Sequence, residues 1–395
     1  MNKQSSIARS RYFAKRAAIK KNRSSKKSPK ISSPKFIPIS TTFKQIKRTP
    51  ILKIPKSETP LTNSQSQTLN WVPLNLPRSE LYLPLTFPTG QTFRWRQTGP
   101  YQFTGVVKSH LVSLKQLDNG NGDVVFCVHS QNNDEGLGSN VAKEALGDYL
   151  NVGISLGEMW EVFSANDERF KELAGCLGGA RVLRQDPLEC LMQFLCSSNN
   201  NIGRITRMVD YISSMGEYLG TVEGFMFYKF PSLERLGAVS EDELRAAGFG
   251  YRAKYIVDTV KILKSKPGGG EEWLASFRGQ DLKVALQALC TLTGVGPKVA
   301  ACVALFSLDQ HHAIPVDTHV WQIATKYLLP DLANARLTQK LCIRVAEVFV
   351  SKFGKYAGWA QTVLFIAELP SQKALLTPAS ETPKEEKSVK KEEGE

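Results

Sequence analysis

A lysine at the start of an apolar segment is the side chain in this sequence best suited to covalent chemistry. Lys298 stands in the run L-T-G-V-G-P-K-V-A-A, which continues as C-V-A-L-F. A helix N-terminus is positively polarised and an apolar wall disfavours an ammonium ion, so both predict a lowered pKa for this lysine. A neutral lysine can attack an electrophilic carbon and form a Schiff base. The competing interpretation is a surface lysine whose stem packs on the turn.

An acid and an imidazole follow in the motif I-P-V-D-T-H-V-W. Asp317 directly precedes an apolar helical pattern, and His319 lies just inside it. Asp317 is expected to cap that helix, and a carboxylate there can also face a developing cation or activate a nucleophile. His319 either contacts a phosphate or sits at the edge of the core.

The segment before the lysine is predicted to be a helical hairpin. Residues 281–292 and 298–308 have helical patterns and are joined by T-G-V-G-P. Gly294 and Gly296 allow a tight turn with exposed backbone N–H groups, and proline suits the first position of the next helix. Such a turn before a helix N-terminus can bind a phosphate, although a simple corner between two helices has the same pattern.

The elements that must position these residues change type along the chain. The runs Y-Q-F-T-G-V-V, H-L-V-S-L-K-Q-L and D-V-V-F-C-V-H-S are typical of strands, and D-N-G-N-G marks a hairpin turn. From about residue 140 the apolar period becomes helical. The sequence therefore predicts an α+β fold, with a small antiparallel β-sheet domain packed on a larger all-helical body. The predicted parts are a basic disordered tail (1–75), the sheet domain (76–150), the helical body (151–370) and a second disordered tail (371–395).

Charge is concentrated at one end of the chain. Of its 51 Lys and Arg residues, seventeen lie within residues 1–57, which contain no Asp or Glu. The remainder is close to neutral, so a nucleic-acid surface there must come from local arrangement of charge. The basic tail predicts nuclear import, with a transit peptide for a mitochondrion or plastid or a phosphate-binding arm as the alternatives. No apolar run approaches the length of a membrane span, so we expect no membrane association.

The seven cysteines indicate a reducing compartment. None forms a C-x-x-C pair, and most lie in apolar helical patterns. This spacing argues against a disulfide framework, a zinc finger and an iron–sulfur cluster. We therefore expect no cofactor and no metal ligand among them. They are Cys127, Cys176, Cys190, Cys196, Cys290, Cys302 and Cys342.

Five separated motifs carry a resemblance to a known family. They are F-P-T-G-Q-T-F-R-W-R, C-S-S-N-N-N-I-G-R-I, G-F-G-Y-R-A-K-Y, V-D-T-H-V-W and Y-A-G-W-A-Q-T-V-L-F. With the lysine-bearing hairpin they resemble the helix-hairpin-helix DNA glycosylases, and among these the eukaryotic 8-oxoguanine DNA glycosylase/AP lyases. The resemblance covers about residues 76–368. It implies a bifunctional enzyme of base excision repair that flips out 8-oxoguanine opposite cytosine, excises it and cleaves the strand by β-elimination.

The resemblance also implies roles for single residues. Lys298 matches the nucleophile that attacks C1′ of the damaged nucleotide, and Asp317 matches the carboxylate that stabilises the positive charge of the sugar. Gln361 matches the residue that hydrogen-bonds the Watson–Crick edge. Phe365 and Cys302 match the two walls that hold the base between them.

The remaining matches are one contact with the base, at Gly90, and a set of contacts with the DNA elsewhere. Gly90 matches the glycine whose carbonyl accepts a hydrogen bond from N7–H, a donor that 8-oxoguanine has and guanine lacks. At position 301 this chain has alanine, where relatives carry an acidic residue before the cysteine. The contact that an acidic side chain could make there is therefore not expected. The residues matched or expected to contact DNA elsewhere are Asn199, Arg204, Tyr251, Arg252, Gly294, Gly296 and His319.

Two alternatives to this function stay open at the level of sequence. One is a glycosylase of the same fold for another damaged base, such as an oxidised pyrimidine or an alkylated purine. The other is a non-catalytic hairpin module that only binds DNA phosphates. We expect a monomer whose partner is double-stranded DNA containing oxidised guanine, located in the nucleus.

Overall fold

The structure is a computed structural model that describes residues 69–129 and 137–372. The first part of the described chain forms an antiparallel sheet. Its five strands pair in the order β1-β5-β4-β3-β2, with every neighbouring pair antiparallel. The D-N-G-N-G run joins β4 to β5, and the N–H of Gly122 donates to the carbonyl of Asn119 at 2.8 Å. The strands are β1 (Val72–Pro73), β2 (Arg96–Gly99), β3 (Gln102–Val107), β4 (His110–Gln116) and β5 (Val124–Val128).

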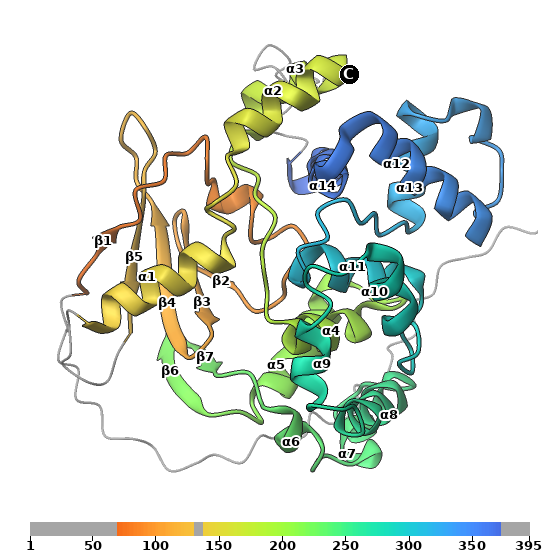
Figure 1. Cartoon of the computed structure of the whole chain (residues 1–395). Helices are drawn as coiled ribbons and strands as arrows, with labels where there is room; N and C mark the ends of the chain where they lie inside the picture. Colours follow the sequence, from red (N-terminus) through yellow and green to blue (C-terminus); the bar gives the residue numbers. More distant parts are fainter. Residues whose placement is uncertain (1–68, 130–136, 373–395) are drawn as a thin grey trace, which may run out of the picture. The chain divides into compact units, whose positions relative to one another are not determined.

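One face of this sheet is covered by α1 (Leu137–Tyr149), which Figure 1 shows lying across the strands. Ala142, Leu146 and Tyr149 recur at helical spacing and are buried against the sheet in one apolar cluster. The indole N–H of Trp95 donates to the Tyr149 hydroxyl at 3.0 Å. The sheet therefore has its own core.

Helices form the rest of the described chain, with a small two-stranded sheet between α5 and α6. The helices are α2 (Leu156–Asn166), α3 (Glu168–Leu177), α4 (Pro187–Ser197), α5 (Ile202–Ser213), α6 (Leu233–Leu236), α7 (Glu241–Ala246), α8 (Arg252–Lys264), α9 (Gly270–Ala275), α10 (Leu282–Leu289), α11 (Pro297–Ser307), α12 (Thr318–Tyr327), α13 (Gln339–Phe353) and α14 (Ala357–Glu368). Single 3₁₀ turns lie at Leu83–Leu85, Pro330–Leu332 and Gly354–Tyr356.

Two of these helices, α4 and α11, occupy the middle of the helical body. All residues of α4 from 187 to 196 are buried, as are residues 299–307 of α11. The two helices pack on each other, and α11 also packs on α10 across the predicted hairpin (Figure 1). Because the α11 segment from 299 to 306 is apolar on all sides, its burial follows from the sequence, whereas α4 also buries Glu189 and Gln193. The predicted α+β fold class is confirmed.

Several short elements were not predicted. The strands β6 (Tyr218–Val222) and β7 (Phe225–Tyr228) form a two-stranded sheet, and α3, α6, α7 and α9 are additional helices. The turn between β6 and β7 uses Glu223 and Gly224, both with positive φ. The segments of four to six residues give too few periodic positions to be recognised from the sequence, whereas α3, with ten residues, is long enough for its helical period to have been recognised.

The predicted tails and import signal fall largely outside the described residues, which exclude 1–68, 130–136 and 373–395. Within the described ranges, no helix combines the length and the hydropathy that a membrane crossing requires.

Candidate active site

The predicted hairpin is present and is held tightly against α8. Gly294 has φ +80°, and a Cβ added there would lie 2.5 Å from the ring of Tyr255. The hydroxyl of Thr259 on α8 donates to the carbonyl of Thr293 at 2.8 Å. Glycine is required at position 294 for two reasons, the left-handed backbone and the close approach of the tyrosine ring.

Lys298 lies in the first turn of α11, as the sequence predicted. The helix is preceded by Gly296, which supplies no side-chain cap, and proline occupies the first position. The Lys298 Nζ lies 5.2 Å from the ring centroid of Phe194 on α4. The side chain of Cys302, one turn further along the same helix, is close enough to Lys298 to raise its pKa.

The electrostatics of Lys298 differ from the prediction. Burial disfavours its ammonium form, but the interactions with the Cys302 side chain and the charge of the Asp317 carboxylate outweigh burial and raise its pKa. Burial in turn raises the pKa of the Cys302 thiol, although Lys298 opposes this. The predicted fall in the lysine pKa was therefore wrong. With its pKa raised, the resting lysine is an ammonium ion. The prediction had weighed burial and the helix terminus but not the Cys302 and Asp317 side chains that oppose them.

Asp317 caps α12 and also acts on the lysine. Its Oδ1 accepts from the backbone N–H groups of His319 and Val320, both at 2.9 Å. No hydrogen bond ends on Oδ2 within the described part of the chain. Since Asp317 raises the pKa of Lys298, its carboxylate is close enough to stabilise a cation there.

The last helix, α14, presents Gln361 and Phe365 four positions apart on one face. Gln361 is buried, and its Oε1 has no hydrogen-bond partner among the described residues. Phe365 is half-buried, and its ring lies edge-on to that of His319, 6.2 Å away at 76°. A buried amide oxygen without a partner is costly to the free protein, so this acceptor points to a ligand.

The turn at Gly90 is held by buried glutamines that the sequence did not single out. Gly90 has φ +83°. Its neighbour Gln91 donates to the carbonyls of Thr86 and Arg181, at 2.8 and 2.9 Å. Gln185 donates to the Gln91 carbonyl at 2.7 Å. No hydrogen bond ends on the Gly90 carbonyl within the described residues, so this oxygen is available to a ligand.

The remaining predicted DNA contacts gather around one loop. Asn199 has φ +47°, and Arg252 Nη2 donates to its carbonyl at 2.9 Å and to that of Ser198. The Tyr251 hydroxyl also donates to the Ser198 carbonyl, at 3.0 Å. Arg204 Nη2 donates to the Gly248 carbonyl at 2.9 Å.

Arg252 and its neighbour Tyr251 differ sharply in exposure. Arg252 is only 2% exposed, whereas Tyr251 is 45% exposed. The buried Nε of Arg252 has no hydrogen-bond partner within the described ranges. The structure thus brings the predicted residues into two groups: Lys298, Cys302, Asp317, His319 and Phe365 are linked by contacts, and Asn199, Arg204, Tyr251 and Arg252 surround one loop.

Comparisons with known proteins identify the family of this chain. Residues 73–191 match the N-terminal domain of 8-oxoguanine DNA glycosylase, and residues 192–347 match the HhH-GPD superfamily of base excision DNA repair proteins. The N-glycosylase/DNA lyase OGG1 of Arabidopsis thaliana is 62% identical over 338 residues, which are 86% of this chain and 90% of that protein. The chain belongs to the 8-oxoguanine DNA glycosylase/lyase family.

More distant members of the family are also similar. The N-glycosylase/DNA lyase of Saccharomyces cerevisiae is 32% identical over 329 residues, covering 75% of this chain and 85% of that protein. A Clostridium acetobutylicum 8-oxoguanine glycosylase/lyase, solved with double-stranded DNA containing cytosine opposite the lesion, superposes with a TM-score of 0.62. It is 28% identical and covers 73% of this chain and 91% of that one.

Family membership settles the class of activity. The predicted enzyme class, a DNA N-glycosylase with lyase activity, is confirmed, and the alternative of a non-catalytic module is excluded. Lys298 and Asp317 therefore belong to a protein of an enzyme family.

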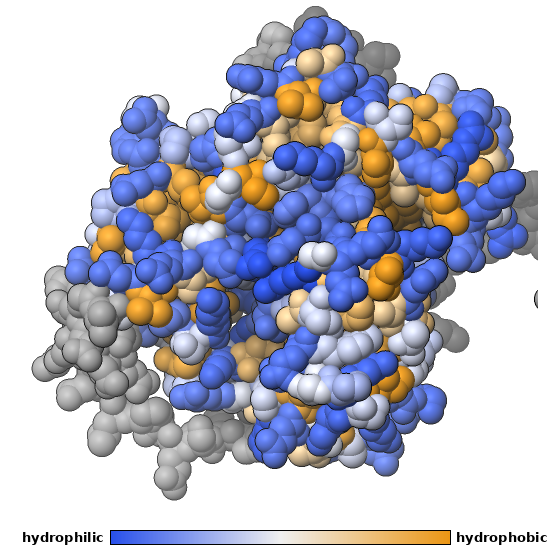
Figure 2. Space-filling view, in the orientation of Figure 1, coloured by the Kyte–Doolittle hydropathy of each residue, from blue (hydrophilic) through white to orange (hydrophobic). Residues whose placement is uncertain are grey.

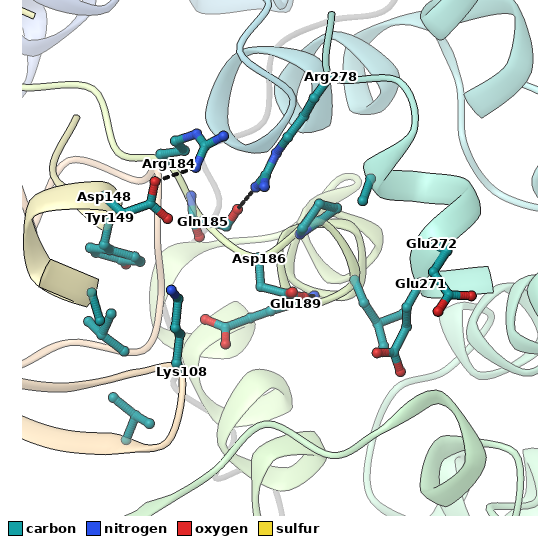
Figure 3. A pocket seen from close by; sticks show the side chains of 16 residues that line it. Lys108, Asp148, Tyr149, Arg184, Gln185, Asp186, Glu189, Glu271, Glu272 and Arg278 are labelled. Atoms are coloured by element: carbon teal, nitrogen blue, oxygen red, sulfur yellow. Dashed lines mark hydrogen bonds and ion pairs between the residues drawn. The ribbon is translucent and has the colours of Figure 1, made fainter. Parts of the chain in front are cut away.

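A separate cavity of about 350 Å³ lies between α1, β3 and the starts of α4 and α9 (Figure 3). Hydrophilic residues cover the middle of the face seen in Figure 2. In the cavity Arg184 pairs with Asp148 and makes two hydrogen bonds to Asp309, at 2.7 and 2.9 Å. Arg278 donates to the Gln185 carbonyl at 3.2 Å. None of the predicted site residues lines this cavity.

Proposed function

We propose that this chain flips 8-oxoguanine opposite cytosine out of duplex DNA, excises it, and then cleaves the strand through a Schiff base on Lys298. The observation that supports it most is the environment of Lys298, a half-buried lysine at an uncapped helix N-terminus with Cys302 and Asp317 beside it. A lysine placed among groups that hold its charge is typical of a catalytic site. Such an enzyme must take its target out of the base stack first.

The chemistry begins with loss of the proton that Lys298 carries at rest. Among the described residues, Asp317 is the carboxylate whose charge acts on this lysine, and we propose that it accepts the proton. The neutral amine then attacks C1′ of the damaged nucleotide, forming a C–N bond. The glycosidic bond breaks, and the base leaves with its electron pair and takes up a proton.

The lyase step follows from the same covalent bond. Opening of the sugar ring converts the C1′ adduct of Lys298 into a protonated Schiff base. This cation makes the C2′ hydrogen acidic, so a proton leaves C2′ and the C3′–O bond breaks with departure of the 3′ phosphate. Water then hydrolyses the Schiff base and regenerates the lysine. Asp317 stabilises the positive charge in both stages.

Recognition of the base rests on four positions. The unpartnered Oε1 of Gln361 faces a hydrogen-bond donor of the flipped base, and Phe365 and Cys302 contact its two faces. The carbonyl of Gly90 accepts from N7–H, which guanine does not carry. With guanine in the pocket, two acceptors would oppose each other, so one contact discriminates strongly between the bases.

The surrounding duplex is bound at two places. The Gly294 to Gly296 turn and the start of α11 offer backbone N–H groups to a phosphate, and His319 contacts the phosphate of the flipped nucleotide. The loop at Asn199 fills the gap left by that nucleotide and bonds the estranged cytosine through Arg204 and Arg252, with Tyr251 as a wedge. We expect the protein to act as a monomer.

A trapping experiment tests this function. The chain is incubated with an 8-oxoguanine:cytosine duplex and borohydride, which reduces the Schiff base to a stable covalent adduct. We expect an adduct with wild type and none with Lys298→Gln, which should still bind the lesion. Lys283→Gln is the matched control, because Lys283 is an exposed lysine on the other helix of the hairpin.

Two results would contradict the proposal. An equal adduct with a thymine-glycol duplex would favour the alternative of a glycosylase for another lesion. Strand cleavage by Lys298→Gln at the wild-type rate would remove the lysine from the reaction.

We also propose nuclear delivery through the basic residues 1–57, with a mitochondrion or plastid as the alternative destinations. Fusion of residues 1–75 to a fluorescent protein tests this directly. Accumulation in the nucleus is the expected result, and import into an organelle would overturn it.

A further inference from the structure

His311 occupies the turn that connects the end of α11 to Asp317. The turn is anchored on both sides: Gln310 donates its side-chain amide to the carbonyls of Phe277 and Gln280, at 3.3 and 2.8 Å. The N–H of Ala313 donates to the Gln310 carbonyl at 2.8 Å. These hydrogen bonds fix the backbone of the turn and so fix where the His311 side chain begins.

The same residue contacts the start of α14 in two ways. The carbonyl of His311 accepts from the N–H of Gly358 at 2.9 Å, which satisfies one of the free N–H groups in the first turn of the helix. The indole N–H of Trp359 donates to His311 Nδ1 at 3.1 Å. The rings of His311 and Trp359 meet edge-on, 5.8 Å apart at 68°, and Tyr356 lies 5.7 Å from the imidazole.

The turn and the start of α14 are in such close contact that no side chain larger than glycine fits at position 358. A Cβ added at Gly358 would lie 2.6 Å from the carbonyl of Ala313 and 2.8 Å from that of His311. Trp359 is 1% exposed. Because Gln361 lies half a turn beyond Trp359, any shift of this end of α14 moves its unpartnered Oε1.

The indole N–H can only donate a hydrogen bond, so the contact fixes the state of the imidazole. Nδ1 of His311 must be unprotonated, and the proton of the neutral ring is on Nε2. A second proton would turn Nδ1 into a donor and place two N–H groups against each other.

We infer that His311 is a positioning residue, which holds α14, with Gln361 and Phe365, in register with Asp317 only while its imidazole is neutral. The inference rests on the proposed function, since it concerns how the same pocket recognises the lesion. Lesion selectivity then depends on pH through a residue that touches neither the base nor the reacting atoms.

The groups around the ring favour the neutral form. Burial lowers the pKa of His311; Asp309 opposes this, whereas His312, Arg184 and Lys355 lower it further. The neutral ring therefore supports the pocket fully above the ordinary imidazole value of 6.5. That support is lost as the pH falls from there through the lowered pKa of the folded protein.

The test compares four variants for binding to 8-oxoguanine:cytosine and guanine:cytosine duplexes, each in the Lys298→Gln background so that no strand is cleaved. His311→Asn keeps an acceptor at the place of Nδ1 and cannot titrate there. His311→Gln places its acceptor one bond further out, and His311→Ala removes it. His312→Asn is the control for loss of a neighbouring imidazole that makes no hydrogen bond within the described residues. Because the charge of His312 lowers the pKa of His311, this control should lose selectivity at a slightly higher pH than the parent.

At about pH 8, where imidazoles are neutral, we expect His311→Ala and His311→Gln to lose on the order of tenfold in lesion selectivity. His311→Asn and His312→Asn should stay close to the parent. On acidification toward about pH 5, the parent and His312→Asn should lose selectivity that His311→Asn retains. Any contribution of His319 is common to all four variants and cancels in this comparison.

Three results would overturn the inference: full selectivity in His311→Ala, equal rescue by asparagine and glutamine, or an identical acid loss in the parent and His311→Asn. Thermal unfolding of each variant checks that the change is confined to the pocket. A parent that fails to prefer the lesion at any pH would instead refute the proposed function.

Discussion

Asp317 has two roles that one pair of substitutions can separate. Its Oδ1 caps α12 through two backbone hydrogen bonds, and its charge raises the pKa of Lys298. Asparagine keeps an acceptor oxygen for the cap but removes the charge, whereas alanine removes both. Asp317→Asn and Asp317→Ala therefore share a loss of charge and differ in the cap.

The stability of the two variants follows from the cap. Replacing an N-cap Asp by Ala costs about 1 kcal/mol of free energy of unfolding, within a range of about 0.5–2, while Asn is an equally good cap. Loss of the charge at the helix N-terminus costs about 0.3–1 kcal/mol in both variants. In a protein of this size we expect Asp317→Ala to unfold about 2–4 °C lower for each kcal/mol lost. The unfolding temperature of Asp317→Asn should be clearly closer to that of wild type.

The activity of the two variants follows from the charge. Positioned acid–base groups and charges that stabilise a transition state each contribute roughly 10²- to 10⁴-fold. We expect both variants to lose about this factor in single-turnover excision from an 8-oxoguanine:cytosine duplex. The assay records the released base and the borohydride-trapped adduct in parallel. An Asp317→Asn variant that excises at the wild-type rate would refute the role of the charge, and one as unstable as Asp317→Ala would refute the account of the cap.

Three more substitutions have outcomes that the structure sets. Gly294→Ala should lower the free energy of unfolding by about 2–4 kcal/mol in chemical denaturation, because the added methyl group clashes with Tyr255 and the backbone is left-handed. Gly296→Ala should lower it by under about 1 kcal/mol, because a methyl group there meets open space and φ is −95°. Gln361→Met removes a buried acceptor without a partner, so the free protein should gain up to about 1 kcal/mol while affinity for the lesion falls; equal affinity would contradict the base contact. Cys302→Ala removes two contributions that raise the pKa of Lys298, so the rising limb of trapping against pH on an abasic duplex should move to lower pH. An unmoved limb would show that the thiol does not influence the lysine.

Much of the site could be predicted because its residues stand in strong local patterns. The hairpin was visible as two apolar helical runs around T-G-V-G-P, and the structure places Gly294 at positive φ there. The capping role of Asp317 was visible in the same way, since an acid directly before a helical pattern is a standard N-cap. These features depend on residues close together in the chain.

What could not be predicted depends on contacts between distant segments. The pKa of Lys298 is raised by Cys302, one turn along the same helix, and by Asp317, nineteen residues further along the chain, whereas the local sequence suggested a lowered pKa. The buried glutamines that hold the Gly90 turn come from residues 91 and 185. Their polar side chains gave no sign of burial, because glutamine is usually exposed.

Within residues 69–129 and 137–372, two buried side-chain polar atoms lack hydrogen-bond partners, and both belong to residues matched to DNA contacts. They are Oε1 of Gln361 and Nε of Arg252. Each costs the free protein stability, since a buried group without a partner has lost its hydrogen bonds to water. A flipped base at Gln361 and an estranged base at Arg252 would satisfy both atoms at once. If both contacts form, binding is most favourable when one nucleotide leaves the stack, and the stability that the free protein gives up then favours base flipping over plain DNA binding.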